Sequence, residues 1–168
     1  MIPKKVFGSE SDKLSRKNSL EEIQEAIKAM ANDKSLGMDG LPIEFYKDNL
    51  DWIGEELFLF YNDAFDNGSL GSDVNRGIIK LLPKIGDRSL VKNWRPFTLL
   101  NLSYKIIAKL LARRIADITK NIVSVTQIGF IKGRYILENL ITSWEAMNWA
   151  KDSRQDVAMI LLDFEKAY

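Results

Sequence analysis

Two different spacings of apolar residues alternate along the chain, and together they predict a mostly helical fold interrupted by one β-ribbon. The string GIIKLLPK, residues 77–84, is short, β-branched at its start and closed by a proline, which favours a strand. The string GDRSLVKN that follows is typical of a loop, so residues 97–100 can return as a second strand. We therefore predict an α+β fold with a two-stranded basic ribbon. The ribbon carries Lys80, Lys84 and Arg95.

Upstream of the ribbon, apolar residues recur at helical intervals. Ser19 and Glu22 have the spacing of a capping box, which predicts a helix that begins there and ends near Asn32. Pro42 suits the first position of a further helical segment, and Gly68 suits the end of that segment.

Downstream of the ribbon, two more amphipathic helices are predicted, over residues 102–122 and from residue 137 to about residue 150. The expected apolar face of the first of these is Tyr104, Ile107, Ala108, Leu111, Ile115 and Ile118. Aromatic residues at core spacing, which we assign to packing, are Phe60, Tyr61, Phe65 and Trp144. Residues 1–17 show no periodicity, so we expect a flexible lead-in before one domain over residues 18–168.

A continuous apolar run at residues 157–162 predicts a strand that is covered on both faces. Asp163 follows this run directly, and a carboxylate at the end of a buried strand suits a magnesium ligand for nucleotidyl transfer. The simpler interpretation is that Asp163 only ends a strand or caps a turn, and the residue taken alone favours it.

Basic residues are concentrated in the middle of the chain. Residues 76–134 contain 13 Lys or Arg and 2 Asp or Glu, whereas residues 1–75 contain 8 and 15, and residues 135–168 contain 3 and 6. The net charge of +1 hides this difference. A basic block of this kind indicates a polyanionic partner, because cations that neutralise phosphates release counterions.

Individual cations in this block have two interpretations each. Lys84 and Arg95 flank a hairpin, where cations are usually only solvated, but Arg95 precedes a proline, and the restricted backbone there suits a guanidinium that binds a phosphate. A stripe of three cations, four residues apart on the helix over 102–122, fits a solvated face and a contact with a template backbone equally well. The stripe is Lys105, Lys109 and Arg113.

The chain contains no cysteine and no histidine. Disulfide frameworks, thiolate zinc sites and nucleophiles that depend on a histidine base are therefore excluded. Any metal site must use oxygen ligands, which favours magnesium, with manganese as the alternative. No apolar run approaches the roughly 18 residues of a membrane span, and no signal peptide is visible, so we expect an intracellular protein, cytoplasmic or nuclear, with no membrane partner.

Several strings resemble, in order and spacing, the reverse transcriptase of non-LTR (LINE-type) retrotransposons. These strings are IIKLLPKIGD, NWRPFTLLNLSYKIIAKLLARRI, QIGFIKGRYILENL and LLDFEKAY, preceded by KSLGMDGLPIEFYK, which resembles a block of the form KSPGPDG. The resemblance covers about residues 19–168. It implies helical fingers with a basic ribbon, plus an incomplete palm, of a right-hand polymerase that binds an RNA template and a DNA primer, or an RNA–DNA hybrid.

The resemblance also implies roles for particular residues. Asp163 would be the first catalytic carboxylate and would bind both magnesium ions, and Phe164 would lie near the triphosphate through its backbone. Tyr168 would be the steric gate that excludes a 2′-hydroxyl. Lys84 and Arg95 would hold the triphosphate of the incoming deoxynucleotide. The residues implied at the template strand are Gln127, Gly129 and Phe130.

The chain departs from the family pattern in several places. Leu36 and Met38 replace two prolines, Phe97 stands where isoleucine is common, and Glu138 stands where aspartate is common. No YADD string, which carries the other catalytic aspartate of the family, occurs in the chain. We therefore expect a partial domain, truncated after the first aspartate motif, which binds magnesium only if the missing half of the palm is supplied.

The leading hypothesis is thus a reverse transcriptase fragment that does not polymerise DNA by itself. A second hypothesis is a non-catalytic nucleic-acid-binding module that retains the fingers surface, and a third is a soluble domain with no retained activity. Binding of RNA at several salt concentrations, with and without charge reversal of the helical stripe, separates the last two.

Overall fold

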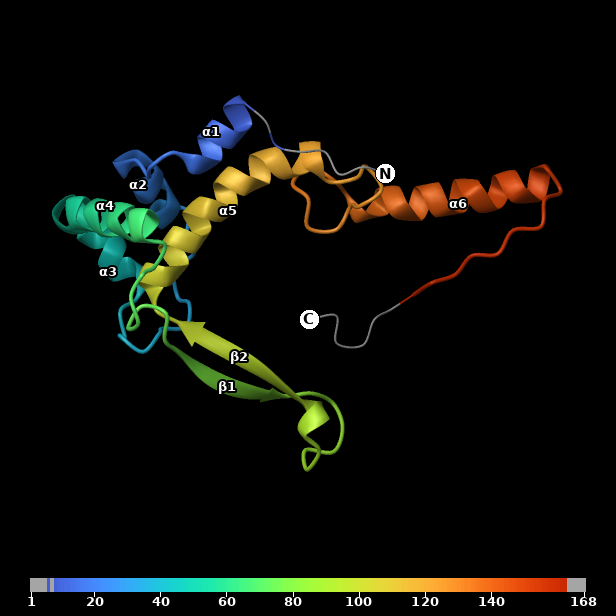
Figure 1. Cartoon of the computed structure of the whole chain (residues 1–168). Coiled ribbons are helices and arrows are strands. Elements are labelled where there is room, and N and C mark those ends of the chain that lie inside the picture. Colours follow the sequence, from blue (N-terminus) through green and yellow to red (C-terminus); the bar gives the residue numbers. More distant parts are fainter. Residues whose placement is uncertain (1–5, 7, 163–168) are drawn as a thin grey trace. The chain divides into compact units, whose positions relative to one another are not determined.

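The computed structural model describes residue 6 and residues 8–162 of the chain (Figure 1). Its elements in chain order are α1 (Ser9–Ser15), α2 (Leu20–Lys28), α3 (Ile43–Asp48), α4 (Leu50–Asn67), β1 (Gly77–Pro83), the 3₁₀ helix η1 (Val91–Asn93), β2 (Trp94–Leu100), α5 (Leu102–Ile122) and α6 (Ile136–Asp152). The prediction of a mixed α+β fold is confirmed. Within the described residues, the sheet is one antiparallel hairpin of β1 and β2.

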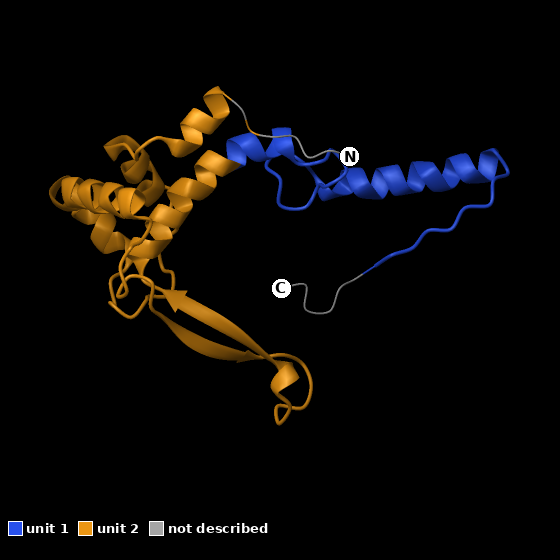
Figure 2. Cartoon of the chain, viewed as in Figure 1, with its two compact units in different colours: residues 1–5, 116–168 blue, residues 6–115 orange. Residues whose placement is uncertain are grey.

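The chain divides into two compact units (Figure 2). The unit that comes first along the chain, called the first unit below, is Val6–Ile115 (orange, unit 2 in the key of Figure 2). The second unit contains the described residues from Ala116 onwards (blue, unit 1 in the key). Helix α5 begins in the first unit and ends in the second.

The core of the first unit lies where α2, α3, α4 and the first half of α5 meet. Its fully buried side chains include Ile23, Ile27, Tyr61 and Ile106. The Tyr61 hydroxyl donates a hydrogen bond to the Ser103 carbonyl oxygen at 2.8 Å, which joins α4 to the start of α5. Burial raises the pKa of this phenol, so Tyr61 stays neutral.

The start and the end of two predicted helices are confirmed in detail. The Ser19 hydroxyl accepts from the Glu22 backbone N–H at 3.3 Å, and the Glu22 carboxylate accepts from the Ser19 backbone N–H at 3.2 Å, so the capping box is present. Gly68 ends α4 in the left-handed conformation, at φ 66°. Helix α2, however, ends at Lys28 instead of near Asn32, and just beyond its end the Lys47 ammonium donates to the Met30 carbonyl oxygen at 2.8 Å.

Two predictions about local structure are wrong, and one helix was not predicted. Within residues 1–17, which we expected to form a flexible lead-in, residues 9–15 form α1, a helix with no buried residue and hence no apolar stripe to reveal it. Residues 157–162 form no strand and are exposed, because among the described residues β1 and β2 pair only with each other and no neighbour covers this run. Trp144, assigned to packing, is 62% exposed on α6.

The apolar face of α5 was predicted only in part. Ile107 and Ile118 are buried as expected, but Ala108 and Ile115 are exposed. The buried positions that the prediction omitted are Leu102, Ile106 and Leu110. These three stand four residues apart and belong to the core shared with α2 and α4, so the buried face of α5 is rotated from the expected one.

Candidate nucleic-acid interface

The hairpin brings the predicted phosphate-binding cations together on one of its faces. Lys80 is paired with Phe97, and Leu82 is paired with Arg95. Directly paired residues of an antiparallel sheet share a face, as do residues two apart on one strand, so Lys80 and Arg95 lie on the same face. Lys84 follows in the same alternation, and its backbone N–H donates to the Asn93 carbonyl oxygen at 2.7 Å, which extends the ladder.

The loop between the strands fixes this register. The Asn93 side-chain amide donates to the Asp87 carbonyl oxygen at 2.6 Å, and the Trp94 indole N–H donates to the Arg88 carbonyl oxygen at 2.8 Å. The Asp87 carboxylate accepts from the Ser89 backbone N–H at 2.9 Å, and hydrogen bonds from the Ser89 backbone and side chain lower the pKa of Asp87. Asp87 is the acidic residue of the loop, and the strands themselves contain none.

The cationic face of the hairpin also carries exposed apolar side chains. Ile78, Leu82 and Phe97 are all exposed, and they alternate with the cations on the same face. A surface that combines guanidinium and ammonium groups with apolar side chains suits a ligand with phosphates and flat bases.

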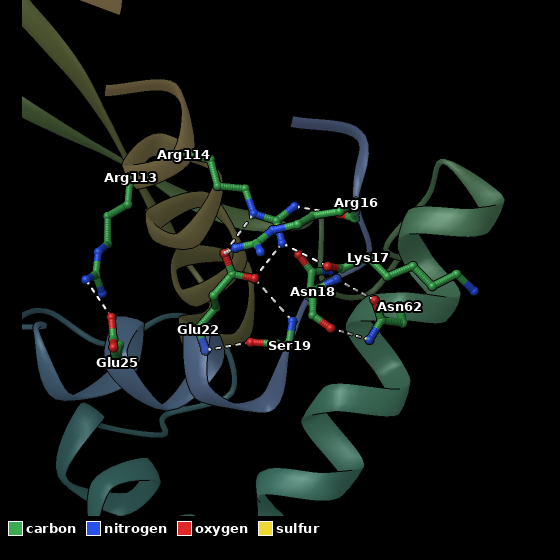
Figure 3. Close-up of polar contacts among 9 residues, drawn as sticks. All are labelled: Arg16, Lys17, Asn18, Ser19, Glu22, Glu25, Asn62, Arg113 and Arg114. Atoms are coloured by element: carbon green, nitrogen blue, oxygen red, sulfur yellow. Dashed lines mark hydrogen bonds and ion pairs between the residues drawn. The ribbon is translucent and has the colours of Figure 1, made fainter. Parts of the chain in front are cut away.

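The helical stripe predicted on α5 does not behave as one surface. The Lys105 ammonium donates to the Ser35 carbonyl oxygen at 3.1 Å, and the Arg113 guanidinium forms an ion pair with Glu25 at 2.8 Å. Lys109 is exposed. Arg113 therefore has an acidic partner on α2, whereas Lys105 is turned towards the loop that follows α2 (Figure 3 shows the Arg113 pair).

Arg114, which the sequence analysis did not single out, is the arginine that α5 turns inward. Its guanidinium donates to both carboxylate oxygens of Glu22, at 3.1 and 2.6 Å, and to the carbonyl oxygens of Arg16 and Lys17 (Figure 3). The hydrogen bond from Arg114 is the main reason why the pKa of Glu22 falls to about 2. The capping box gives a partial sequence signal for this ion pair, because it predicts that the Glu22 carboxylate is held at the start of α2, where an arginine can bind it.

In the second unit, the segment that links α5 to α6 is held by one arginine. The Arg134 guanidinium donates to four carbonyl oxygens, those of Lys120, Val123, Ser124 and Gln127, the first two at 3.1 and 3.2 Å. Carbonyls at the end of a helix have no intrahelical partner, so Arg134 caps the end of α5 and closes the loop after it. The sequence analysis missed this residue, although cations near helix ends are a recognisable signal.

This loop displays the residues predicted at the template strand. Ile128 and Ile131 are buried and anchor it, while Gln127 and Gly129 are exposed. Phe130 is fully exposed and has a positive φ of 64°, a conformation that a bulky residue adopts only under constraint. An exposed ring on a constrained backbone is a candidate platform for a base.

The family model for reverse transcriptase (RNA-dependent DNA polymerase) matches residues 82–168, just over half of the chain. The chain belongs to the reverse transcriptase family. The match begins within β1 and includes the hairpin loop, β2, α5, the Phe130 loop and α6.

A curated relative extends the similarity upstream of the reverse transcriptase match. Over 150 residues, 89% of this chain, the sequence is 35% identical to a protein of Xenopus laevis described as the transposon TX1 uncharacterized 149 kDa protein. The chain spans 12% of the length of that relative. Both findings confirm the predicted resemblance to retrotransposon reverse transcriptases. The activity and partners of such full-length proteins are only proposed for this chain, below.

Reverse transcriptases use divalent metals, which in this chain would need carboxylate ligands. Asp163, the metal ligand that the family resemblance implies, lies outside the described residues, as do Phe164 and Tyr168. Over residue 6 and residues 8–162, no group of three or more acidic residues has the arrangement of a metal site.

Within the part of the reverse transcriptase fragment that the structure describes, no helix has the length and apolar character needed to cross a membrane.

Proposed function

We propose that this chain is the fingers and first palm portion of a retrotransposon reverse transcriptase and that it binds RNA through its basic hairpin and the Phe130 loop. The observation that carries the proposal is the common face of Lys80, Lys84 and Arg95, on strands without a carboxylate. Three cations on a short ribbon can neutralise successive phosphates and release their counterions. The match to the reverse transcriptase family supports the same ligand.

In this proposal, Lys84 and Arg95 contact RNA phosphates in this chain and would bind the triphosphate of the incoming deoxynucleotide in an intact polymerase. Gln127, Gly129 and Phe130 border the template. A guanidinium suits this role because it donates two parallel hydrogen bonds to one phosphate. Arg95 precedes Pro96, which restricts its backbone. Lys105 and Lys109 are proposed to contact the template backbone. Arg113 is a weaker candidate for such a contact, because Glu25 already neutralises its charge.

The test is the salt dependence of binding to a fluorescein-labelled single-stranded RNA. We expect the Lys84→Glu/Arg95→Glu variant to bind more weakly and to show a shallower slope of log K against log salt, by about 1.4, since each phosphate contact on a single strand contributes about 0.7. The matched control is Lys13→Glu/Lys151→Glu, which makes the same charge change at two exposed lysines outside the basic block. Equal effects of the two double variants would contradict the proposal, because net charge alone would then explain binding.

We also propose that the 168-residue polypeptide does not polymerise DNA by itself. The two-metal mechanism of the family needs more than one carboxylate, and of the family's aspartate motifs the chain contains only the one at Asp163. Primer extension on an RNA template, with magnesium and separately with manganese, measures this directly. Template-dependent incorporation above the level of an Asp163→Ala control would refute the claim.

A further inference from the structure

A pocket of about 460 Å³ lies in the first unit, outside the hairpin, beside the loop that follows α2. Residues of this loop, the end of α2, the start of α3 and the first half of α5 line it. Its volume is within the range of roughly 300–1,000 Å³ that small-molecule sites occupy.

The loop wall of this pocket is held in place by Asn101. A Cβ on Gly37 would lie 2.5 Å from the Asn101 Cα, so only glycine allows this approach. The Asn101 side-chain oxygen accepts from the Met38 backbone N–H at 2.8 Å, and the Lys105 ammonium donates to the Ser35 carbonyl oxygen at 3.1 Å. These contacts fix the wall against the start of α5, so the pocket is preformed.

The charged side chains that line the pocket are all lysines. Lys34 comes from the loop, and Lys105 and Lys109 come from successive turns of α5. None of the lining residues is acidic. Arg113, one turn further along α5, is paired with Glu25, whereas Lys105 and Lys109, the cations of the first half of the helix, form no ion pair with a carboxylate of the described residues.

The remaining wall of the pocket is largely apolar. Met30, Leu36, Leu41 and Ile43 contribute to it from the first helices and their connections, and Leu102 contributes from α5. Leu36 stands where the related block has proline, and its side chain is 43% exposed, so it is available to a ligand. The pocket therefore joins an apolar surface to three ammonium groups.

We propose that this pocket binds one nucleotide of a single-stranded RNA, with a phosphate at the lysines and the base against the apolar wall. A nucleotide combines these two kinds of group, whereas an acidic peptide side chain would leave the apolar wall uncovered. The inference rests on the proposed RNA binding and adds a second RNA contact, at residues that lie outside the hairpin.

The test uses the full chain and a short fluorescein-labelled oligouridylate, with two kinds of variant. Lys34→Glu/Lys109→Glu removes two of the cations and leaves Lys105 bound to the loop. We expect weaker binding and a salt slope shallower by about 0.7, because the pocket holds one phosphate of the single strand. Leu36→Trp fills the apolar part of the pocket without a change of charge, and we expect about tenfold weaker binding with an unchanged slope, as for the loss of one base contact.

The control for the filling variant is Met38→Trp. Met38 lies two residues away in the same loop, is 56% exposed and does not line the pocket, so this variant should bind like the wild type. Circular dichroism and thermal unfolding of every variant verify that the fold is retained.

The outcomes separate this inference from the proposed function. If the hairpin variant loses affinity while both pocket variants bind like the wild type, the pocket inference and the template contact of Lys109 are overturned, and RNA binding by the hairpin stands. If the wild-type chain does not bind RNA, both are overturned. Displacement of the RNA by polyglutamate as readily as by unlabelled oligouridylate would also overturn the inference, because charge alone would then account for occupancy.

Discussion

The guanidinium of Arg114 and the carboxylate of Glu22 are joined by two hydrogen bonds, Nε to Oε1 at 3.1 Å and Nη2 to Oε2 at 2.6 Å (Figure 3). Only 7% of the Arg114 side chain is exposed. The same guanidinium binds two backbone carbonyl oxygens just before α2, so one side chain connects α5 to the start of the helical core. The capping glutamate thus serves two helices.

Replacement of Arg114 by alanine should lower the free energy of unfolding by about 2 kcal/mol, because hydrogen bonds to charged groups contribute roughly 1.5–3 kcal/mol and Glu22 would lose its principal partner. Urea denaturation followed by circular dichroism measures this. Arg113→Ala is the matched control. It removes a more exposed ion pair with Glu25, so its effect should stay below about 1 kcal/mol. Equal losses in the two variants would contradict the assigned difference.

The stability of the chain should fall in acid through Glu22. Its pKa is lowered from 4.5 to about 2 in the folded protein, so the unfolded state binds the proton more readily. The contribution of Glu22 to the free energy of unfolding is therefore fully present above about pH 4.5 and is lost as the pH falls towards 2. Urea titrations at several pH values should show a shallower acid decline for Glu22→Gln than for the wild type, and parallel curves would exclude this role.

Gly37→Ala should destabilise the loop against α5. The new methyl group would meet the backbone of Asn101 at 2.5 Å, and backbone cannot move aside as a flexible side chain can. A loss of about 1–3 kcal/mol is expected, the usual cost of overpacking. Gly129→Ala is the control, since a Cβ there meets nothing within 4 Å. Thermal unfolding of both variants gives the comparison, and a neutral Gly37→Ala would mean that the close approach is absent in solution.

Arg134→Met should release the loop after α5. The variant retains the length of the side chain but donates none of the four hydrogen bonds to carbonyl oxygens. Amide hydrogen exchange should accelerate at Gln127, Ile131 and Arg134, whose backbone N–H groups are bonded within this loop. Lys132→Met, which removes only an exposed ion pair with Asp117, should leave exchange unchanged. Equal acceleration in both variants would contradict a positioning role for Arg134.

Features that depend on local sequence were predicted well. The capping box at Ser19, the end of α4 at Gly68 and the strand at residues 77–83 each depend on a few neighbouring residues with specific backbone preferences. The reverse transcriptase family was identified because several motif strings keep their order and spacing, which no single residue could establish.

Features that depend on distant partners were not predicted. The inward turn of Arg114 requires Glu22, which lies 92 residues away, and the pairing of Arg113 with Glu25 removed a residue from the expected stripe. Residues 157–162 have the composition of a buried strand, but burial also needs a neighbouring element, which sequence periodicity does not supply. The pocket beside Gly37 was likewise invisible, because its lysines come from separate segments.

The register of the hairpin has a consequence for comparing natural variants of this sequence. Lys80 and Arg95 share a face only because each lies an even number of residues from the Lys84–Asn93 pair on its own strand. Slippage by one residue would carry the cations of one strand to the opposite face. A single insertion or deletion in residues 85–92 that shifts the register would therefore separate the cations needed for the proposed RNA binding while every cation is retained. Loop length is thus as informative as residue identity when related copies are judged functional or decayed.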